Sequence, residues 1–484
     1  MIWNHLRRER AGGRTTSDEQ SNLELGTTLD ILHHPFQTSY NVTTFNQVLY
    51  AICHPLRTLC VRSLGLRNAV VIMDEFHKLP FTSLPYFFRM AAAHYARTGC
   101  RFIFGSATPM PSTDYLGTLH WRSLPQKIRS RLQEHPAVDH RRIYRRVSDM
   151  TIEDVGNWIS TFEKESETSL LVVLNLVGKG TWPLRKRFVG QYAPERDVQL
   201  LENEEADRVT VFLDGLTPPF LRKHLIGACK RAMEKRPVTL ITTQMVEVGV
   251  DLDFEHGLVD FQGLAATIQR GGRIGRNALP ETPCTVEVFR LMLDDGKPSN
   301  QLLRDVRDKY DARFQLDTFT TEQKAEHRQE RREDRFFKKW QIGQELRDSE
   351  ITEELLRIQR TICEKMPSID SMRKLFRDME GSSGYQGLDY LNSQFIAEIY
   401  GESGGQEVLV LESRDAFEHL YKLLEEERQF PGQDTARELR RFVAERRVQT
   451  FIDEVFSLST LEQVGTLPEF NGMRCFVPIG SNII

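Results

Sequence analysis

Short apolar runs alternate with longer mixed stretches from about residue 41, a pattern typical of strands separated by helices. Four of these runs, at 69–73, 101–104, 169–174 and 238–241, are apolar at most positions without alternating with polar residues. Continuous apolarity is typical of parallel strands that are covered on both faces. Small or polar residues follow each run, at the sheet edge where open α/β proteins bind ligands. The sequence therefore predicts an α/β protein with two groups of buried parallel strands, separated by residues 110–168.

The last third of the chain has a different pattern. Residues 301–350 contain 24 charged side chains, 12 of each sign, which is typical of exposed helix surface. Apolar residues at helical spacing predict helices over 414–428 and 435–456. We therefore expect a mainly helical C-terminal domain over residues 301–484.

Composition limits the function classes. Apolar residues make up 40% of the 484 residues and charged residues 27%, which are ordinary values for a soluble globular protein. The 64 Lys and Arg against 68 Asp and Glu exclude a globally basic surface, although not a local basic track. The seven cysteines lack zinc-site spacing, and we find no signal peptide and no apolar run of membrane-spanning length. These features predict a cytoplasmic protein with reduced thiols and no membrane partner.

An acidic segment, Asp74-Glu75-Phe76-His77, directly follows the first apolar run. Two carboxylates at one strand end repel each other, and Mg²⁺ relieves that repulsion because it prefers carboxylate oxygens, water and phosphates. Asp74 and Glu75 are therefore candidate metal ligands, although the pair alone also fits a charged turn. Ser106-Ala107-Thr108 follows the second run, and its hydroxyls could bond a nearby carboxylate or histidine.

Two further segments carry phosphate-binding chemistry. Gln269–Arg276 contains three glycines and places Arg273 and Arg276 three residues apart, so on a helix they would share one face. Guanidinium groups bind phosphate oxygens in a bidentate manner. Residues 242–254 begin at a predicted strand end and alternate polar positions at Gly249, Asp251 and Asp253. The plainer alternative is a basic surface helix for residues 269–276 and an exposed loop for residues 242–254.

These segments resemble motifs of superfamily 2 helicases in order and spacing: motif II at 74–77, motif III at 106–108, motif V at 242–254 and motif VI at 269–276. Residues 42–49 resemble the motif that contacts the nucleic-acid backbone, and 171–175 resemble motif IV. His77, the extended motif V over 244–254 and the segment 213–222 are most similar to the CRISPR-associated helicase of type I interference systems. This resemblance covers about residues 40–290. The ending Gly275-Arg276-Asn277 departs from that family and is closer to helicases in general.

The resemblance implies two RecA-like domains, an incomplete first one over 1–140 and a second over 141–300, followed by the helical domain. It implies ATP-driven movement along single-stranded DNA, with ATP and Mg²⁺ as cofactors. Asp74 would hold magnesium through water, Glu75 would orient the attacking water, and Arg273 and Arg276 would contact the nucleotide phosphates. His77, Gly249, Asp251 and Gln269 would contact ATP. Ser106 and Thr108 would couple the nucleotide state to movement of the domains, and Thr44 and Thr243 would contact nucleic acid.

One element of such a motor is absent from the sequence. No stretch of the form G-x-x-x-x-G-K-[ST] occurs, and in the family this phosphate-binding loop would precede residue 1. We therefore expect the isolated chain to bind ATP weakly and to hydrolyse it negligibly. The expected partners are single-stranded DNA, a CRISPR effector complex, and a separate nuclease or N-terminal motor fragment. The alternatives are a non-catalytic nucleic-acid-binding or docking remnant, and another superfamily 2 translocase acting on DNA or RNA.

Overall fold

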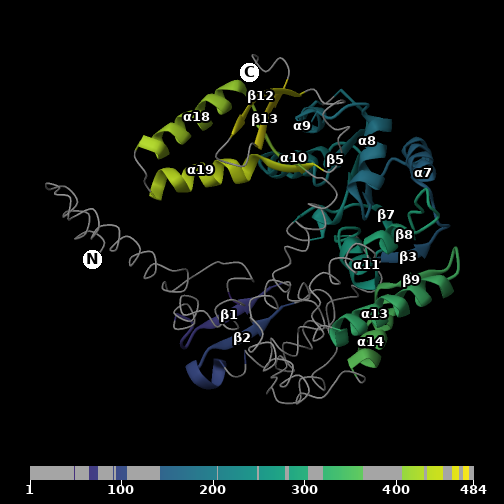
Figure 1. Cartoon of the computed structure of the whole chain (residues 1–484). Coiled ribbons are helices and arrows are strands. Elements are labelled where there is room, and N and C mark those ends of the chain that lie inside the picture. Colours follow the sequence, from purple (N-terminus) through teal and green to yellow (C-terminus); the bar gives the residue numbers. More distant parts are fainter. Residues whose placement is uncertain are drawn as a thin grey trace. The chain divides into compact units, whose positions relative to one another are not determined.

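The computed structural model of the chain describes residues 48, 65–74, 91, 94–105, 142–193, 195–203, 205–247, 250–277, 283–303, 320–363, 406–429, 433–450, 461–467 and 473–478 (Figure 1). The chain forms two compact units. The first contains strands β1 and β2, and the second contains every other element that is given below.

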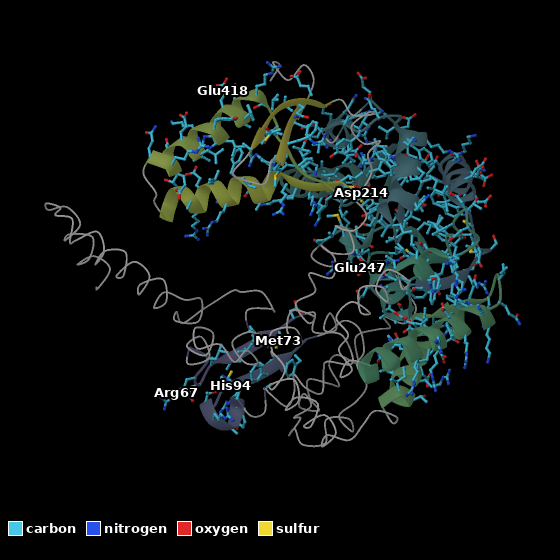
Figure 2. All side chains as sticks on the ribbon, in the orientation of Figure 1. Arg67, Met73, His94, Asp214, Glu247 and Glu418 are labelled. Carbon is cyan, nitrogen blue, oxygen red and sulfur yellow. The ribbon has the colours of Figure 1, made fainter. Side chains whose placement is uncertain are left out.

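The first unit holds a pair of parallel strands, β1 (Val70–Met73) and β2 (Arg101–Phe104). Both were predicted as strands, and their parallel pairing is confirmed. The predicted burial on both faces is wrong for this pair, because Val70, Ile72 and Ile103 are 58%, 72% and 53% exposed. Met73, which is labelled in Figure 2, is buried. One face of this pair is thus apolar and open to solvent.

The second unit is built on a seven-stranded sheet in the order β5-β6-β4-β7-β8-β3-β9. Adjacent strands are parallel except for β9, which pairs antiparallel with β3. The strands are β3 (Arg142–Arg146), β4 (Leu170–Val173), β5 (Val209–Leu213), β6 (Val238–Thr242), β7 (His256–Asp260), β8 (Cys284–Phe289) and β9 (Glu345–Arg347). β4 and β6 are buried at every position, which confirms the prediction for this group.

Helices cover this sheet. They are α7 (Ile152–Glu165), α8 (Trp182–Phe188), α9 (Arg196–Glu202), α10 (Pro219–Met233), α11 (Leu264–Gly271), α13 (Thr320–Lys339) and α14 (Asp348–Cys363), with a π-helical turn at Val177–Thr181 and a 3₁₀ turn, η6, at Gln244–Val246. Side chains of α7 and α8 share a core with Leu170, Val172 and Leu258. Gly257 faces the opposite side, where a Cβ would collide with Ile274 just after α11. The fold is therefore a layered α/β structure, as predicted.

The C-terminal region contains a four-stranded sheet that the sequence analysis did not predict. Its order is β11-β10-β13-β12, with β10 (Gln406–Val410), β11 (Arg447–Thr450), β12 (Leu461–Leu467) and β13 (Met473–Pro478). Helices α18 (Arg414–Gln429) and α19 (Gln433–Arg446) pack on it, and more of the described residues after 300 lie in helices than in strands. The helix predicted over 435–456 ends at Arg446, because the next four residues pair with β10 as a strand.

Residues 320–363 are attached to the seven-stranded sheet. β9 extends the sheet beside β3, and α14 contacts both α11 and β3. The proposed domain boundary near residue 300 therefore does not mark the end of packing on this sheet. No helix in the described part of the chain has the length and apolarity that membrane crossing requires.

Candidate functional site

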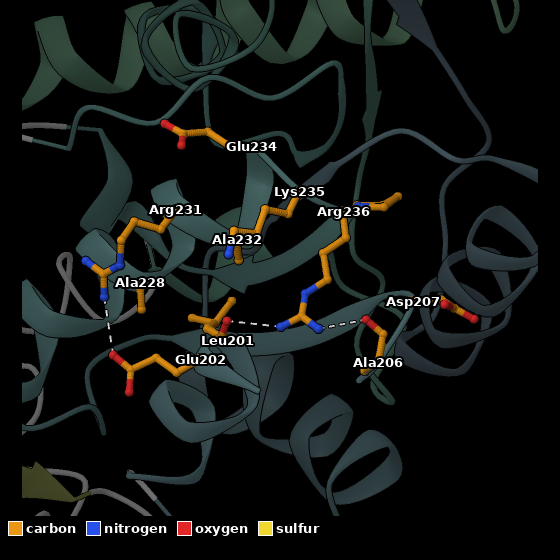
Figure 3. Close-up of a pocket in the computed structure, with 11 residues that line it drawn as sticks. Leu201, Glu202, Ala206, Asp207, Ala228, Arg231, Ala232, Glu234, Lys235 and Arg236 are labelled. Atoms are coloured by element: carbon orange, nitrogen blue, oxygen red, sulfur yellow. Dashed lines mark hydrogen bonds and ion pairs between the residues drawn. The ribbon is translucent and has the colours of Figure 1, made fainter. Parts of the chain in front are cut away.

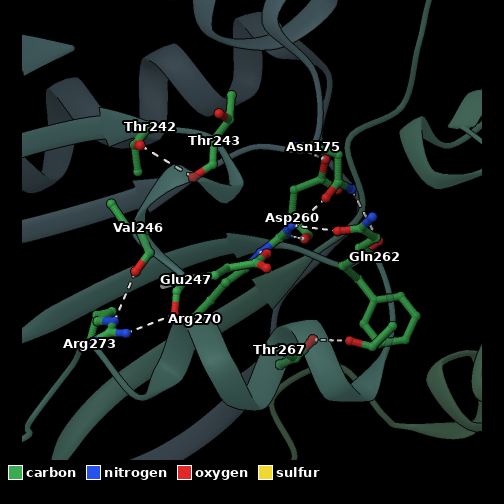
Figure 4. A network of polar contacts seen from close by, with 12 residues as sticks. Asn175, Thr242, Thr243, Val246, Glu247, Asp260, Gln262, Thr267, Arg270 and Arg273 are labelled. Carbon is green, nitrogen blue, oxygen red and sulfur yellow. Dashed lines mark hydrogen bonds and ion pairs between the residues drawn. The ribbon is translucent and has the colours of Figure 1, made fainter. Parts of the chain in front are cut away.

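Polar residues gather where the parallel strands of the large sheet end. Asn175 lies just after β4, Thr243 follows β6, and Asp260 is the last residue of β7. Because carboxyl ends of parallel strands meet at one sheet edge, segments far apart in sequence converge here. Figure 4 shows this edge, with α11 lying beside it.

Arg270 is the centre of a buried polar network at this edge. Its side chain is fully buried, and it donates to four acceptors. These are Glu247 Oε1 at 3.0 Å, Asn175 Oδ1 at 2.9 Å, the Asp260 carbonyl at 2.7 Å and Gln262 Oε1 at 2.7 Å. Burial of a guanidinium is tolerated when it is paired and hydrogen-bonded in this way. Arg270 thus joins motif VI to the strand ends of β4 and β7 and to motif V (Figure 4).

Asp260 is a second buried charge in the same place. Its carboxylate accepts hydrogen bonds from Ser299 Oγ at 2.6 Å, from the Leu291 amide at 2.9 Å and from the Asn175 amide at 3.3 Å. Burial raises the pKa of Asp260 to about 6, against these hydrogen bonds and the nearby Arg270, which lower it. The edge therefore holds a carboxyl group that titrates near neutral pH.

Arg273 lies after the end of α11, which terminates at Gly271. The expectation that Arg273 and Arg276 share a helical face is therefore wrong. The chain instead turns and pairs with motif V: the Phe254 amide donates to the Arg273 carbonyl at 2.9 Å, and the Gly275 amide donates to the Phe254 carbonyl at 2.8 Å. Gly275 has a φ of 61°, which favours glycine at this turn. Arg273 donates to the carbonyls of Val246 at 2.9 Å and Glu247 at 2.7 Å.

Arg276 contacts Asp251 directly, which brings two predicted site residues together. Arg276 Nη1 lies 2.8 Å from Asp251 Oδ1, and both side chains are substantially exposed. Lys230 also reaches this carboxylate, at 2.8 Å, and its hydrogen bond, together with the charges of Lys230 and Arg276, lowers the pKa of Asp251. Asp253 accepts from the backbone amide of Arg276 at 2.7 Å. The polar positions of motif V therefore fix the segment that carries Arg276.

The α13–α14 hairpin contacts the first turn of α11 directly and the end of α11 through Arg142 of β3. Glu333 of α13 is buried and accepts from the Leu264 amide at 3.3 Å, at the first turn of α11. At the other end, Arg142 donates to the Gly271 carbonyl at 2.9 Å and to Asp348 of α14 at 2.8 Å. Tyr144 donates to the same Asp348 at 2.9 Å. Residues 320–363 thereby fix the helix that leads into motif VI.

The acidic segment of the first unit is described only in part. Asp74 is exposed at the end of β1, and a Cβ at Gly105, just after β2, would lie 3.3 Å from Asp74 Oδ1. The ends of β1 and β2 therefore adjoin, as their parallel pairing predicted. The remaining site predictions at Thr44, Glu75, His77, Ser106, Thr108 and Gly249 lie outside the described residues. Within the described set, no group of three or more His, Cys, Asp and Glu side chains could hold a metal ion.

The other predicted residues differ in accessibility. Gln269 is half-buried in α11, and Thr243 is 6% exposed, so the Thr243 side chain is not displayed to solvent. The sequence analysis missed Arg270 and Glu247 as site residues. Arg270 carried a weak signal, because it falls three positions after Thr267 and both are buried in α11.

A pocket of about 610 Å³ lies at the opposite edge of the sheet (Figure 3). It is lined by segments that precede β5 and β6 and by the end of α10. Its charged groups are engaged locally: Arg231 pairs with Glu202 at 3.2 Å, and Arg236 donates to backbone carbonyls that include that of Ala206. The charged groups of this pocket therefore link α9 to α10 and to the residues that follow it.

Comparison with known proteins identifies the segment that contains these motifs. Residues 199–279 match the family described as CRISPR-associated nuclease/helicase Cas3, C-terminal. This segment is Cas3-like. The CRISPR-associated nuclease/helicase Cas3 of Methanothermobacter thermautotrophicus is 31% identical to this chain over 116 residues, which are 24% of this chain and 12% of that protein. The Cas3-like segment includes Glu247, Asp251, Arg270, Arg273 and Arg276.

Solved structures also show similarity at low sequence identity. A structure of T. fusca Cas3 with ADP is 14% identical, with a TM-score of 0.47, and the alignment covers 90% of this chain and 54% of that one. A structure described as a CRISPR-associated protein is 15% identical, with a TM-score of 0.49, over 91% of this chain and 52% of that one. This chain thus spans about half the length of these structures and a much smaller share of the curated relative.

Proposed function

We propose that this chain is the helicase portion of a CRISPR-associated defence system, which uses ATP and Mg²⁺ to move along single-stranded DNA. The observation that carries the proposal is the convergence of motifs V and VI within the Cas3-like segment, with Arg276 on Asp251 at 2.8 Å. A CRISPR effector complex and a separate nuclease are the proposed partners, in the cytoplasm.

The proposed chemistry assigns a role to each group. Asp74, exposed at its strand end, suits a hydrated magnesium ion, which prefers few protein ligands. Glu75 orients the attacking water, and Arg273 and Arg276 stabilise charge that develops on the phosphates. The proposed nucleotide contacts are His77, Gly249, Asp251 and Gln269. Ser106 and Thr108 would couple the nucleotide state to movement of the domains, and Thr44 and Thr243 would contact DNA.

A second candidate is a non-hydrolysing DNA-binding remnant, and a specific observation favours it. In this structure Arg273 is bonded to two backbone carbonyls and Arg276 to Asp251. Both guanidiniums would have to exchange these partners for phosphate oxygens. The 484 residues also lack G-x-x-x-x-G-K-[ST], so the β- and γ-phosphates lack the donors that such a loop supplies.

A phosphate-release assay with single-stranded DNA separates these candidates. We expect negligible turnover from the chain alone, and DNA-stimulated turnover when a polypeptide with the phosphate loop is added. Glu75→Gln and Arg276→Gln should each abolish that turnover. Arg231→Gln is the matched control, because Arg231 is also an exposed, ion-paired arginine but lies at the opposite sheet edge. DNA binding without turnover under all conditions would favour the remnant, and turnover that survives Glu75→Gln would refute the assignment.

A further inference from the structure

A groove between α13 and α14 concentrates positive charge. It encloses a cavity of about 430 Å³, within the size range of ligand pockets. Four cationic side chains line it, against the single carboxylate of Glu354: they are Arg332, Arg335, Lys339 and Arg357. Phe336 and Ile358 form its apolar part. The residues that line the groove lie outside the Cas3-like segment.

The fold separates charges that alternate in the sequence. The acidic residues Glu333 and Asp334 turn inward, where Glu333 accepts from the Leu264 amide and Asp334 pairs with Arg290 at 3.1 Å. The Glu333 carboxylate is therefore hydrogen-bonded and the Asp334 carboxylate is ion-paired, and neither lines the groove. The cations that remain outside give α13 a basic face, although the region 301–350 is balanced in charge.

The cations of this face are regularly placed and available. Arg332, Arg335 and Lys339 are spaced by three and four residues, so they form one stripe along the helix. In the part of the chain that the structure describes, none of these three side chains makes an ion pair or a hydrogen bond. Arg357 of α14 faces the stripe and is paired with Glu354. Successive cations along the stripe lie roughly 4.5 and 6 Å apart along the helix axis, from a rise of about 1.5 Å per residue.

We propose that this groove binds the backbone of single-stranded nucleic acid, with Phe336 as a surface on which a base stacks. A row of cationic side chains, most of them guanidiniums, suits successive phosphates, and an adjoining half-buried aromatic ring suits a base. Phe336 is held by Trp340, with ring centroids 5.8 Å apart, so the ring is supported from one side. An acidic protein segment would use the cations but would have no need of the ring, and this favours nucleic acid.

Fluorescence anisotropy with the full chain tests the proposal without ATP, so its outcome is independent of the proposed hydrolysis. The ligand is a labelled oligothymidylate of about 20 nucleotides, titrated between about 50 and 200 mM salt. We expect the double variant Arg332→Gln, Arg335→Gln to weaken binding about tenfold and to reduce the slope of log affinity against log salt by about 1.4, since two phosphate contacts are lost. The control Arg331→Gln, Lys338→Gln removes the same charge from exposed positions of α13 outside the groove. It should change affinity less than about twofold.

Two further measurements decide the class of ligand. Phe336→Leu should weaken binding about fivefold while leaving the salt slope unchanged, because stacking adds no charge. Poly-glutamate of equal charge should bind more weakly than the oligonucleotide and should be insensitive to Phe336→Leu. Equal weakening by the groove and control pairs would overturn the proposal. Poly-glutamate binding as tight as that of DNA would overturn it in favour of an acidic protein partner. Thermal unfolding of each variant checks that the fold is retained.

Discussion

Two sheets of this protein are made from the same kind of sequence and differ in their surroundings. β6, with the sequence VTLIT, is buried at all five positions, whereas β1, with VVIM, exposes Val70 and Ile72. β6 lies between two strands and beneath helices, and among the described residues β1 pairs with one strand. Apolar runs thus predict strands and their direction, and the number of neighbouring layers determines burial.

The ends of the two sheets differ in the same way. At the edge of the large sheet, Arg270 and Asp260 are buried and bonded from several elements. At the edge of the small sheet, Asp74 is exposed. Charges that are buried in a completed network contribute to the fold, and exposed ones are accessible to ligands. The following predictions test that contrast, beginning with the largest expected effect.

Arg270→Ala should destabilise the second unit by about 3–5 kcal/mol, because it leaves the Glu247 carboxylate buried without its partner. Urea unfolding can be followed by the fluorescence of Trp158, Trp182 and Trp340, which lie in this unit. Arg276→Ala is the exposed counterpart and should change the midpoint little. Similar losses from the two variants would contradict the distinction between a buried network and an accessible arginine.

Ile241→Ala in β6 should cost about 2–5 kcal/mol, since Ile241 is fully buried in the core shared with α7 and α8. The same urea titration measures the cost. A loss below about 1 kcal/mol would mean that this core collapses around the missing atoms more easily than its packing indicates.

Some elements of the fold could be predicted from particular residues of the sequence, and others could not. The apolar runs located β1, β2, β4 and β6, and helical spacing located α18 with its buried Ala416, Leu420, Leu423 and Leu424. The four-stranded C-terminal sheet was missed, because its strands β10 and β11 pair across 36 intervening residues between Val410 and Arg447. Such pairing leaves no local signal.

The candidate site also has features that the sequence predicts and features that it cannot predict. The motif spacing selected both Arg276 and Asp251 as candidate site residues, and their side chains form an ion pair. It could not show that Gly271 ends α11, where Tyr144 packs so closely that a Cβ would lie 2.3 Å from its hydroxyl. It also could not show that Glu333 and Asp348, more than 60 residues beyond α11, would hold this helix. These contacts depend on tertiary packing.

Asp348→Ala should destabilise the second unit by about 1–3 kcal/mol, because the buried Tyr144 hydroxyl and the Arg142 guanidinium lose their acceptor. It should also speed amide hydrogen exchange in α11, which mass spectrometry measures. Glu353→Ala is the control, because Glu353 is an exposed carboxylate on the same helix. Unchanged exchange in α11 would show that the hairpin does not fix that helix.

Asp260 should make the stability of the second unit, which contains the large sheet, depend on pH. Its pKa in the folded state is about 6, above the ordinary value near 4, so the folded protein holds a proton that the unfolded chain releases. The contribution of Asp260 to stability should therefore fall as pH rises from about 4 to 6 and stay constant above. Relative to wild type, Asp260→Asn should be more destabilising at pH 5 than at pH 7, by about 1–2 kcal/mol. Urea unfolding measures this loss of stability at each pH. A loss that is the same at pH 5 and pH 7 would contradict the raised pKa of Asp260.

Ile72→Ala should have the smallest effect, although it is the same substitution as Ile241→Ala in the same kind of strand. Ile72 is 72% exposed, so truncation removes little buried area and should change the free energy of unfolding by less than about 0.5 kcal/mol. It should also reduce binding of a hydrophobic dye, because it shrinks the apolar face that Ile72 shares with its strand neighbour Ile103. Thermal unfolding and dye fluorescence of the full chain measure both quantities. A loss of about 2 kcal/mol or more would show that this face is covered in solution, and the two sheets would then differ less than their exposure indicates.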